Sequence, residues 1–145
     1  MDIFTSLKVS SSALTVQRYR MNIISSNLAN IETIKTKEGG PYKRKEIVVS
    51  SEDVSGNFQQ ILDSKLAGAI KEVKIQGYID DNRPPVAKYD PSNPEADPDG
   101  YVRYPNINII EEITNLTMAS RNYESNVTVI STTKRLALQT LEIGK

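Results

Sequence analysis

The 145-residue chain contains no cysteine, no histidine and no tryptophan. These absences exclude disulfide bonds, Cys/His zinc sites, thiol redox chemistry and nucleophilic catalysis by Ser-His-Asp or Cys-His groups. Seven tyrosines and two phenylalanines are the only aromatic residues, which disfavours a base-stacking platform or a cofactor pocket. Eighteen basic residues balance eighteen acidic ones, so no net charge attracts nucleic acid. We therefore expect no cofactor, no metal, and neither nucleic acid nor a small molecule as a partner.

Apolar residues are also scarce, at 38% of the chain. No stretch approaches the roughly 20 consecutive apolar residues of a membrane-spanning helix. Residues 1–5 show no basic segment followed by an apolar run, so we expect no cleaved secretory signal peptide. So thin an apolar supply implies a chain that folds loosely or takes part of its core from neighbouring molecules.

Glycine and proline are concentrated in the middle of the chain. Of seven glycines and seven prolines, all but Gly144 lie within residues 39–105. Because these two residue types most disfavour a helix interior, the flanking segments are predicted to be helical. The expected fold is mainly α with a small β-rich insert. Its three segments are an N-terminal helical arm (1–38), a central β-rich module with a long irregular loop (39–105), and a C-terminal helical arm (106–145).

Both arms carry a heptad pattern. Asp2 is the expected N-cap of the first arm, and Asn108 followed by Glu111 predicts a capping box at the start of the second. A helix from there to residue 142 would be roughly 50 Å long, which favours pairing of the two arms as a coiled coil. The residues predicted to form this assembly interface are Leu7, Leu14, Met21 and Leu28 in the first arm, and Ile109, Ile113, Leu116, Tyr123, Val127, Ile130 and Leu141 in the second, whose seam also includes Ser120, Lys134 and Ala137.

Other apolar residues of the arms lie off this seam. Two helices cannot cover them, so we expect neighbouring copies or relatives to do so, as in a subunit of an assembly. These residues are Val9, Val16, Tyr19, Ile23, Ile110, Val129 and Leu138.

The central module is predicted to contain short strands. Residues 46–50 and 70–79 have the composition and alternation of strands. Residues 58–66 fit a short helix or another strand. Six of the seven prolines fall within 84–105, which predicts a rigid and irregular loop there.

Acidic residues offer the remaining route to chemistry, and their spacing does not support it. Counted from Asp97, Tyr101 stands at the fifth ligand position of an EF-hand, so an acidic loop pinned by proline is the better interpretation. Glu111 and Glu112 are adjacent on a helix and point in different directions, which makes a poor catalytic pair. Lys43–Lys45 is typical of a solvated strand edge. We expect that the chain is not an enzyme, although a small carboxylate-based cell-wall enzyme stays an alternative.

Four blocks of sequence carry a distinctive combination of residues. The N-terminal block spans 12–33 and the C-terminal block 112–127, and the central blocks span 39–45 and 89–106. Their distinctive residues include Asn27, Ala29, Asn30, Thr33, Gly39, Gly40, Pro41, Tyr42, Tyr89, Asp90, Pro91, Asn93, Pro94, Asp97, Gly100, Tyr101, Pro105, Asn106, Arg121, Tyr123 and Asn126. These blocks resemble the bacterial flagellar basal-body rod proteins, and the central two resemble the proximal-rod type, the FlgC family.

The resemblance implies a structural subunit of the proximal rod that transmits torque from rotor to hook. It further implies export through the flagellar type III apparatus and a place in the periplasmic part of the basal body. The implied partners are other rod proteins, the basal-body adaptor at the rotor and neighbouring copies, with the long loop bridging subunits. Another flagellar axial subunit, of rod or hook, is the alternative within this class.

Overall fold

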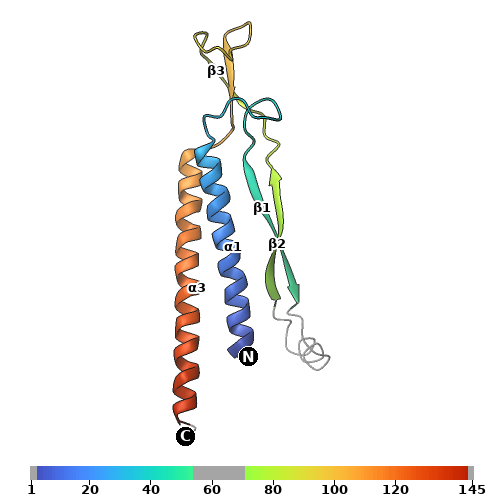
Figure 1. The fold of residues 1–145 in the computed structure, drawn as a ribbon. Coiled ribbons are helices and arrows are strands. Elements are labelled where there is room, and N and C mark those ends of the chain that lie inside the picture. Colours follow the sequence, from blue (N-terminus) through green and yellow to red (C-terminus); the bar gives the residue numbers. More distant parts are fainter. Residues whose placement is uncertain (1–2, 54–70, 144–145) are drawn as a thin grey trace.

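The computed structural model describes residues 3–53 and 71–143, so the expectations for Asp2 and for residues 58–66 lie outside the described residues. Two long helices lie side by side, and two antiparallel hairpins accompany them (Figure 1). The mainly α fold with small β elements is thereby confirmed. The elements are α1 (Ile3–Ala29), β1 (Lys45–Asp53), β2 (Lys71–Asp80), β3 (Val86–Tyr89), β4 (Tyr101–Tyr104) and α3 (Ile109–Ile143).

Helix α1 is shorter than the predicted arm, because it ends at Ala29 and not near residue 38. The side-chain amide of Asn30 donates to the carbonyl of Ser26 at 2.8 Å, and the amide of Thr33 donates to the carbonyl of Asn30 at 3.1 Å. Asparagine competes for backbone groups in this way and favours turns over helix. Absence of glycine and proline was therefore not sufficient to keep the chain helical.

Helix α1 packs between α3 and the β1–β2 hairpin (Figure 1). Val16 on this helix is 5% exposed. Two polar contacts fix the hairpin to α1: Lys8 pairs with Glu72 at 3.3 Å, and the amide of Val73 donates to the hydroxyl of Ser12 at 3.3 Å. The hairpin thus lies along the side of α1 that α3 leaves open. This corrects our expectation that other copies supply all the cover for the off-seam residues of α1, among which Val9, Val16 and Ile23 are buried or half-buried in the single chain.

Helix α3 begins as the capping pattern predicts. The Asn108 side-chain oxygen accepts hydrogen bonds from the amides of Ile110 at 3.0 Å and Glu111 at 3.4 Å. The Asn108 carbonyl accepts the first helical bond, from the amide of Glu112 at 3.0 Å. Asn108 is therefore the N-cap.

Replacing this cap should weaken the fold measurably. Asn108→Ala leaves two amides of the first turn without their acceptor and should cost about 1 kcal/mol of unfolding free energy. Urea unfolding followed by circular dichroism measures the difference. Asn108→Asp is the control, since it keeps an acceptor at the cap. A loss of equal size in both variants would contradict this role.

The contact face of α3 differs from the predicted seam by one residue along one of its two lines. Leu116, Tyr123 and Ile130 are half-buried, as the seam requires. The buried residues beside them are Glu112 and Ala119, each 1% exposed, which begin the line Glu112, Ala119, Asn126 and Thr133. The predicted line runs one residue later, and its apolar members Ile113, Val127 and Leu141, together with Ile109 at the start of the helix, are 43–69% exposed.

The β1–β2 hairpin confirms both predicted strands over the described residues. Its register pairs Lys45 with Asp80 and Asp53 with Lys71. The register shifts between Val48, which pairs with Gly77, and Val49, which pairs with Ile75, so a β-bulge lies in β2 next to Gly77. Gly77 has a positive φ of 145°, which few other residues tolerate.

The proline-rich stretch is more regular than predicted, because β3 and β4 pair within it. Val86 lies opposite Tyr104, and Tyr89 lies opposite Tyr101 with ring centroids 5.4 Å apart. The prolines of this stretch stand outside both strands, so none of them removes a donor from the ladder. The loop between the strands, residues 90–100, is called the tip below.

Gly100 is the tightest point of the tip. It has φ of 82°, and a Cβ there would stand 2.9 Å from Cε2 of Tyr89 and 3.2 Å from Cβ of Pro91. Gly100→Ala should therefore lower the unfolding free energy by about 1–3 kcal/mol. Gly40→Ala is a matched control, since its φ is 74° and no atom lies within 4 Å of the added carbon. Thermal unfolding should show a larger loss at Gly100, and equal losses would exclude the packing argument.

Candidate functional site

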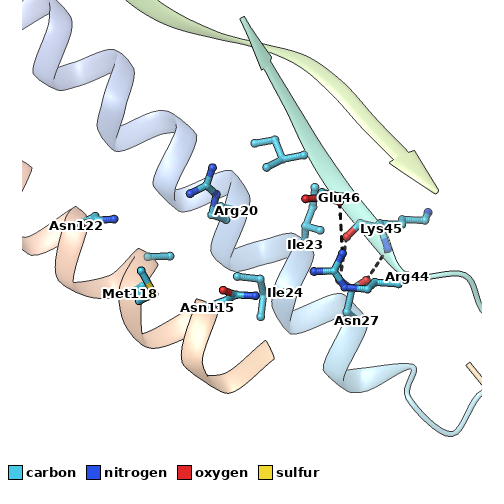
Figure 2. A pocket seen from close by; sticks show the side chains of 12 residues that line it. Arg20, Ile23, Ile24, Asn27, Arg44, Lys45, Glu46, Asn115, Met118 and Asn122 are labelled. Atoms are coloured by element: carbon cyan, nitrogen blue, oxygen red, sulfur yellow. Dashed lines mark hydrogen bonds and ion pairs between the residues drawn. The ribbon is translucent and has the colours of Figure 1, made fainter. Parts of the chain in front are cut away.

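A polar cluster joins both helices and the first hairpin at the end where α1 finishes and α3 begins. We call it the helix junction, and it consists of Asn27, Tyr42, Arg44, Lys45 and Glu112. Asn27 is fully buried, and its side chain makes both backbone hydrogen bonds of Lys45, donating to the carbonyl and accepting from the amide at 2.9 Å each (Figure 2). The Tyr42 hydroxyl donates to the same Asn27 oxygen at 3.1 Å. One amide side chain thereby fixes the start of β1 against α1.

Glu112 completes the junction from α3. Its carboxylate accepts a hydrogen bond from the Asn27 amide at 3.2 Å and an ion-paired one from Nε of Arg44 at 2.8 Å. The Glu112 side chain is 1% exposed and that of Arg44 is 12% exposed. A buried carboxylate is tolerated only when paired and hydrogen-bonded, and here both its oxygens have partners.

Further charges surround Arg44. Its guanidinium lies 3.6 Å from Glu46 and 3.9 Å from Asp81. Burial alone would lower the pKa of Arg44, but the hydrogen bond and charge of Glu112, with the charges of Glu46 and Glu111, raise it above its ordinary value. The backbone hydrogen bond from Arg83 lowers the pKa of Asp81 below its usual range, and the Arg83 and Arg44 charges act in the same direction. Arg44 and Asp81 therefore both keep their charges near neutral pH.

The sequence did not reveal two members of the junction. Arg44, within the predicted solvated strand edge at Lys43–Lys45, is instead half-buried and paired with Glu112. Glu112 and Glu111 do point differently, as expected, since Glu111 is exposed. A charged residue at a contact position of α3 is the one signal that could have identified Glu112. Reading it required the correct assignment of the contact positions along α3.

The tip uses its polar side chains to hold its own backbone. Asp97 accepts a hydrogen bond from the amide of Tyr101 at 2.9 Å, and Asn93 accepts one from the amide of Glu95 at 3.1 Å. Asp90 accepts from the hydroxyl of Ser92 at 2.7 Å. Asx interactions of this kind are what such residues contribute to turns. Within residues 3–53 and 71–143, no group of three or more Asp or Glu side chains could hold a metal ion.

Exposed apolar residues follow α3 on two sides. The line of α3 directly opposite α1 is polar and exposed, and we call it the back strip: Thr114, Arg121, Thr128, Arg135 and Glu142. Apolar side chains that are 43–77% exposed flank it, namely Ile110, Ile113, Val127, Leu138 and Leu141 on one side and Met118, Val129 and Leu136 on the other. The chain exposes 10569 Å² in all, whereas a compact monomer of 16.2 kDa exposes about 7500 Å². Such a surface is typical of a subunit that is covered by neighbours.

Comparison with known proteins assigns these features to a family. A family model described as "Flagella basal body rod protein" matches residues 7–33, and one described as "Flagellar basal body rod FlgEFG protein C-terminal" matches residues 99–143. The flagellar basal-body rod protein FlgC of Bacillus subtilis is 41% identical over 152 aligned residues, which cover 100% of both chains. The chain belongs to the FlgC family of flagellar basal-body rod proteins.

Other FlgC proteins are similar over nearly the same length. That of Borreliella burgdorferi is 38% identical, with 99% of this chain and 98% of the relative covered. That of Salmonella typhimurium is 36% identical, with 94% of each covered. Membership of the FlgC family makes the chain a structural subunit of the flagellar rod. Over the described residues, neither helix is apolar enough over sufficient length to cross a membrane.

The residues that resemble the FlgC family are distributed over several parts of the structure. Asn27 and Tyr42 lie in the junction, and Thr33 connects to it because the Tyr42 amide donates to the Thr33 carbonyl at 2.9 Å. Gly39 and Gly40 both have positive φ, in the turn before β1. Eight of them belong to the tip and its flanks: Tyr89, Asp90, Pro91, Asn93, Pro94, Asp97, Gly100 and Tyr101. The side-chain amide of Asn106 donates to the carbonyl of Pro84. The others are Ala29 and Asn30 at the end of α1, Pro41, buried Pro105, Arg121 on the back strip, half-buried Tyr123, and half-buried Asn126.

Proposed function

We propose that the chain acts in the proximal rod by transmitting torque from the rotor to the hook through α1 and α3, paired as a coiled coil. The observation that carries this proposal is the identity to FlgC proteins over the full length of both chains. A shaft that transmits torque requires stiff elements. Two helices of about 40 and 52 Å, lying side by side, meet that requirement.

The coiled coil is supported by the contact lines of the two helices. On α3, Leu116, Tyr123 and Ile130 form one line at seven-residue spacing, and Ala119 and Asn126 belong to the other. On α1, the line Leu7, Leu14, Met21 and Leu28 is half-buried throughout. Alternating steps of three and four residues are the spacing of knobs-into-holes packing.

The assembly interface is proposed on the apolar residues that the single chain leaves exposed. Of the residues predicted to form the assembly interface, Ile109, Ile113, Val127 and Leu141 are exposed and therefore available to neighbours. The half-buried residues of the predicted interface lie beneath them, between the two helices. We also propose that residues 1–38 and 106–145 act as two helical arms in the rod, and residues 39–105 as a central module.

The partners proposed are neighbouring copies, other rod proteins and the basal-body adaptor at the rotor. We also propose that the flagellar type III apparatus exports the chain into the periplasmic part of the basal body. The absence of cysteine is suited to this route, because no stray thiol can oxidise there. None of these roles requires catalysis, cofactor or nucleic acid.

Deletion of the gene tests the proposal. Cells without the chain should build basal bodies that lack the rod and should not swim, and a plasmid copy should restore both. Swimming in soft agar and electron microscopy of isolated basal bodies measure the two outcomes. Complete rods in the deletion strain would overturn the proposed function, whether its filaments are paralysed or normal.

A further inference from the structure

The two exposed apolar sides of α3 lie on opposite sides of the plane through both helices. Positions along a helix advance by 100° per residue, so a residue's heptad position fixes its direction relative to the seam. Ile113 and Val127 follow one flank of the seam, and we call this flank of exposed apolar side chains the ridge, with Ile110, Leu138 and Leu141. Met118, Val129 and Leu136 follow the other flank, and the polar back strip separates the two.

The flank with Met118 is hollowed. A groove of about 290 Å³ lies between α1, β1 and α3, and Figure 2 shows the side chains that line it. Asn115, Met118 and Asn122 line it from α3, and Ile23 and Arg20 from α1. Met118 is 58% exposed, so the groove presents an adaptable apolar side chain beside amide groups.

The ridge and the groove are complementary in charge. None of the ion pairs among the described residues involves Arg20 of the groove. The ridge carries the exposed carboxylate of Glu124 among its apolar residues. A cation beside an apolar wall and an anion on an apolar ridge suit each other, and such pairs mainly fix the register of a contact.

The exposed area is sufficient for two contacts per chain. The excess over a compact monomer is about 3000 Å², and one protein contact of standard size buries about 800 Å² on each partner. A contact between two different surfaces of the same chain repeats from copy to copy, whereas a contact between identical surfaces stops at a dimer. Repetition is what a rod subunit requires.

We propose that the ridge of one copy docks in the groove of a second copy of this chain, so that the copies join side by side through different surfaces. This inference rests on the proposed function and names the partner of the exposed faces. The β1 strand becomes part of the contact, because it forms one wall of the groove.

Cross-linking tests the contact directly, because the chain has no cysteine of its own and the added cysteines are its only thiols. The strain's own gene is replaced by a full-length variant carrying Ile113→Cys and Met118→Cys, and motile cells are treated with a short bismaleimide. Ile113 and Met118 lie on opposite flanks of α3, and any link formed within one chain leaves the mass of the monomer unchanged, so only links between chains give larger bands. We expect dimers and larger multimers on a denaturing gel, detected by an epitope tag.

Single-cysteine variants identify the geometry. Either variant alone should remain monomeric, and co-expression of the two should give dimers only. A variant with Thr128→Cys and Met118→Cys is the matched control, because Thr128 is an exposed neighbour of Val127 on the back strip and lies about 15 Å along the helix axis from Met118, and it should give no multimers. Val127→Cys replaces Ile113→Cys in a second pair, in case copies are offset along the helix axis.

The possible results separate this inference from the proposed function. Dimers from a single-cysteine variant would show contact between identical surfaces and would overturn the proposal. Absence of multimers from both ridge pairs in cells that swim would also overturn it, while leaving the role in the rod intact. Cross-links only to a protein of different mass would assign the groove to another rod component, and likewise exclude the second copy.

Discussion

Glu112→Ala should be among the most destabilising single substitutions in this chain. It removes both carboxylate oxygens of Glu112 at once, so Arg44, whose side chain is only 12% exposed, loses its main partner, and the Asn27 amide loses one acceptor. Removal of one member of a buried pair typically costs 3–5 kcal/mol, and about 3 kcal/mol is expected here because Glu46 and Asp81 still neutralise part of the charge. Urea unfolding of the purified chain, followed by circular dichroism, measures the loss.

Two further variants make the result specific. Glu111→Ala removes the neighbouring exposed carboxylate and should change stability by less than about 0.5 kcal/mol. A double variant with Glu112→Leu and Arg44→Met removes the charge together with its partner and should recover much of the stability. If Glu112→Ala alone unfolds at the same urea concentration as the parent chain, the junction does not stabilise the fold.

A charge in the seam of α3 should abolish swimming. Leu116→Asp or Ile130→Asp places a carboxylate without a partner between the two helices, where an unpaired charge is strongly unfavourable. Because export acts on the unfolded chain in the proposed route, export of the variants should remain detectable. Swimming in soft agar and immunoblots of exported protein measure the two effects.

The back strip supplies the control for this pair. Thr128→Asp adds the same charge two residues from Ile130, but on the exposed side of α3, and should leave swimming close to normal. Immunoblots of whole cells check that the variants accumulate to similar levels. Normal rods containing Leu116→Asp would show that the seam is assigned to the wrong residues.

The sequence predicted the elements better than it predicted their contacts. Glycine and proline positions located both helices, and the Asn108 cap located the start of α3 correctly. Hydrophobic spacing identified Leu116, Tyr123 and Ile130, but assigned Ile113 to the contact face in place of Glu112. Apolar periodicity cannot distinguish a face turned to the chain's own core from one turned to a neighbour, and this chain has both.

The junction could not be predicted because it depends on partners far apart in the sequence. Asn27 and Glu112 are 85 residues apart, and each residue alone is typical of a solvated helix face. Only the fold brings them to Arg44. The β3–β4 hairpin was missed for a different reason: the density of prolines suggested irregular structure, although all of them stand outside the strands.

The position of the junction makes α3 a cantilever. The helix is clamped near its first turn, where Glu112 is 1% exposed, and its last residue that is equally buried is Ala119. For the remaining length its side chains are at best half-buried. A beam held at one end deflects most at the other, so in the isolated chain the C-terminal half of α3 should sway furthest. Neighbouring subunits would therefore contribute most of the bending stiffness there, while the helix junction sets the direction in which α3 extends from it.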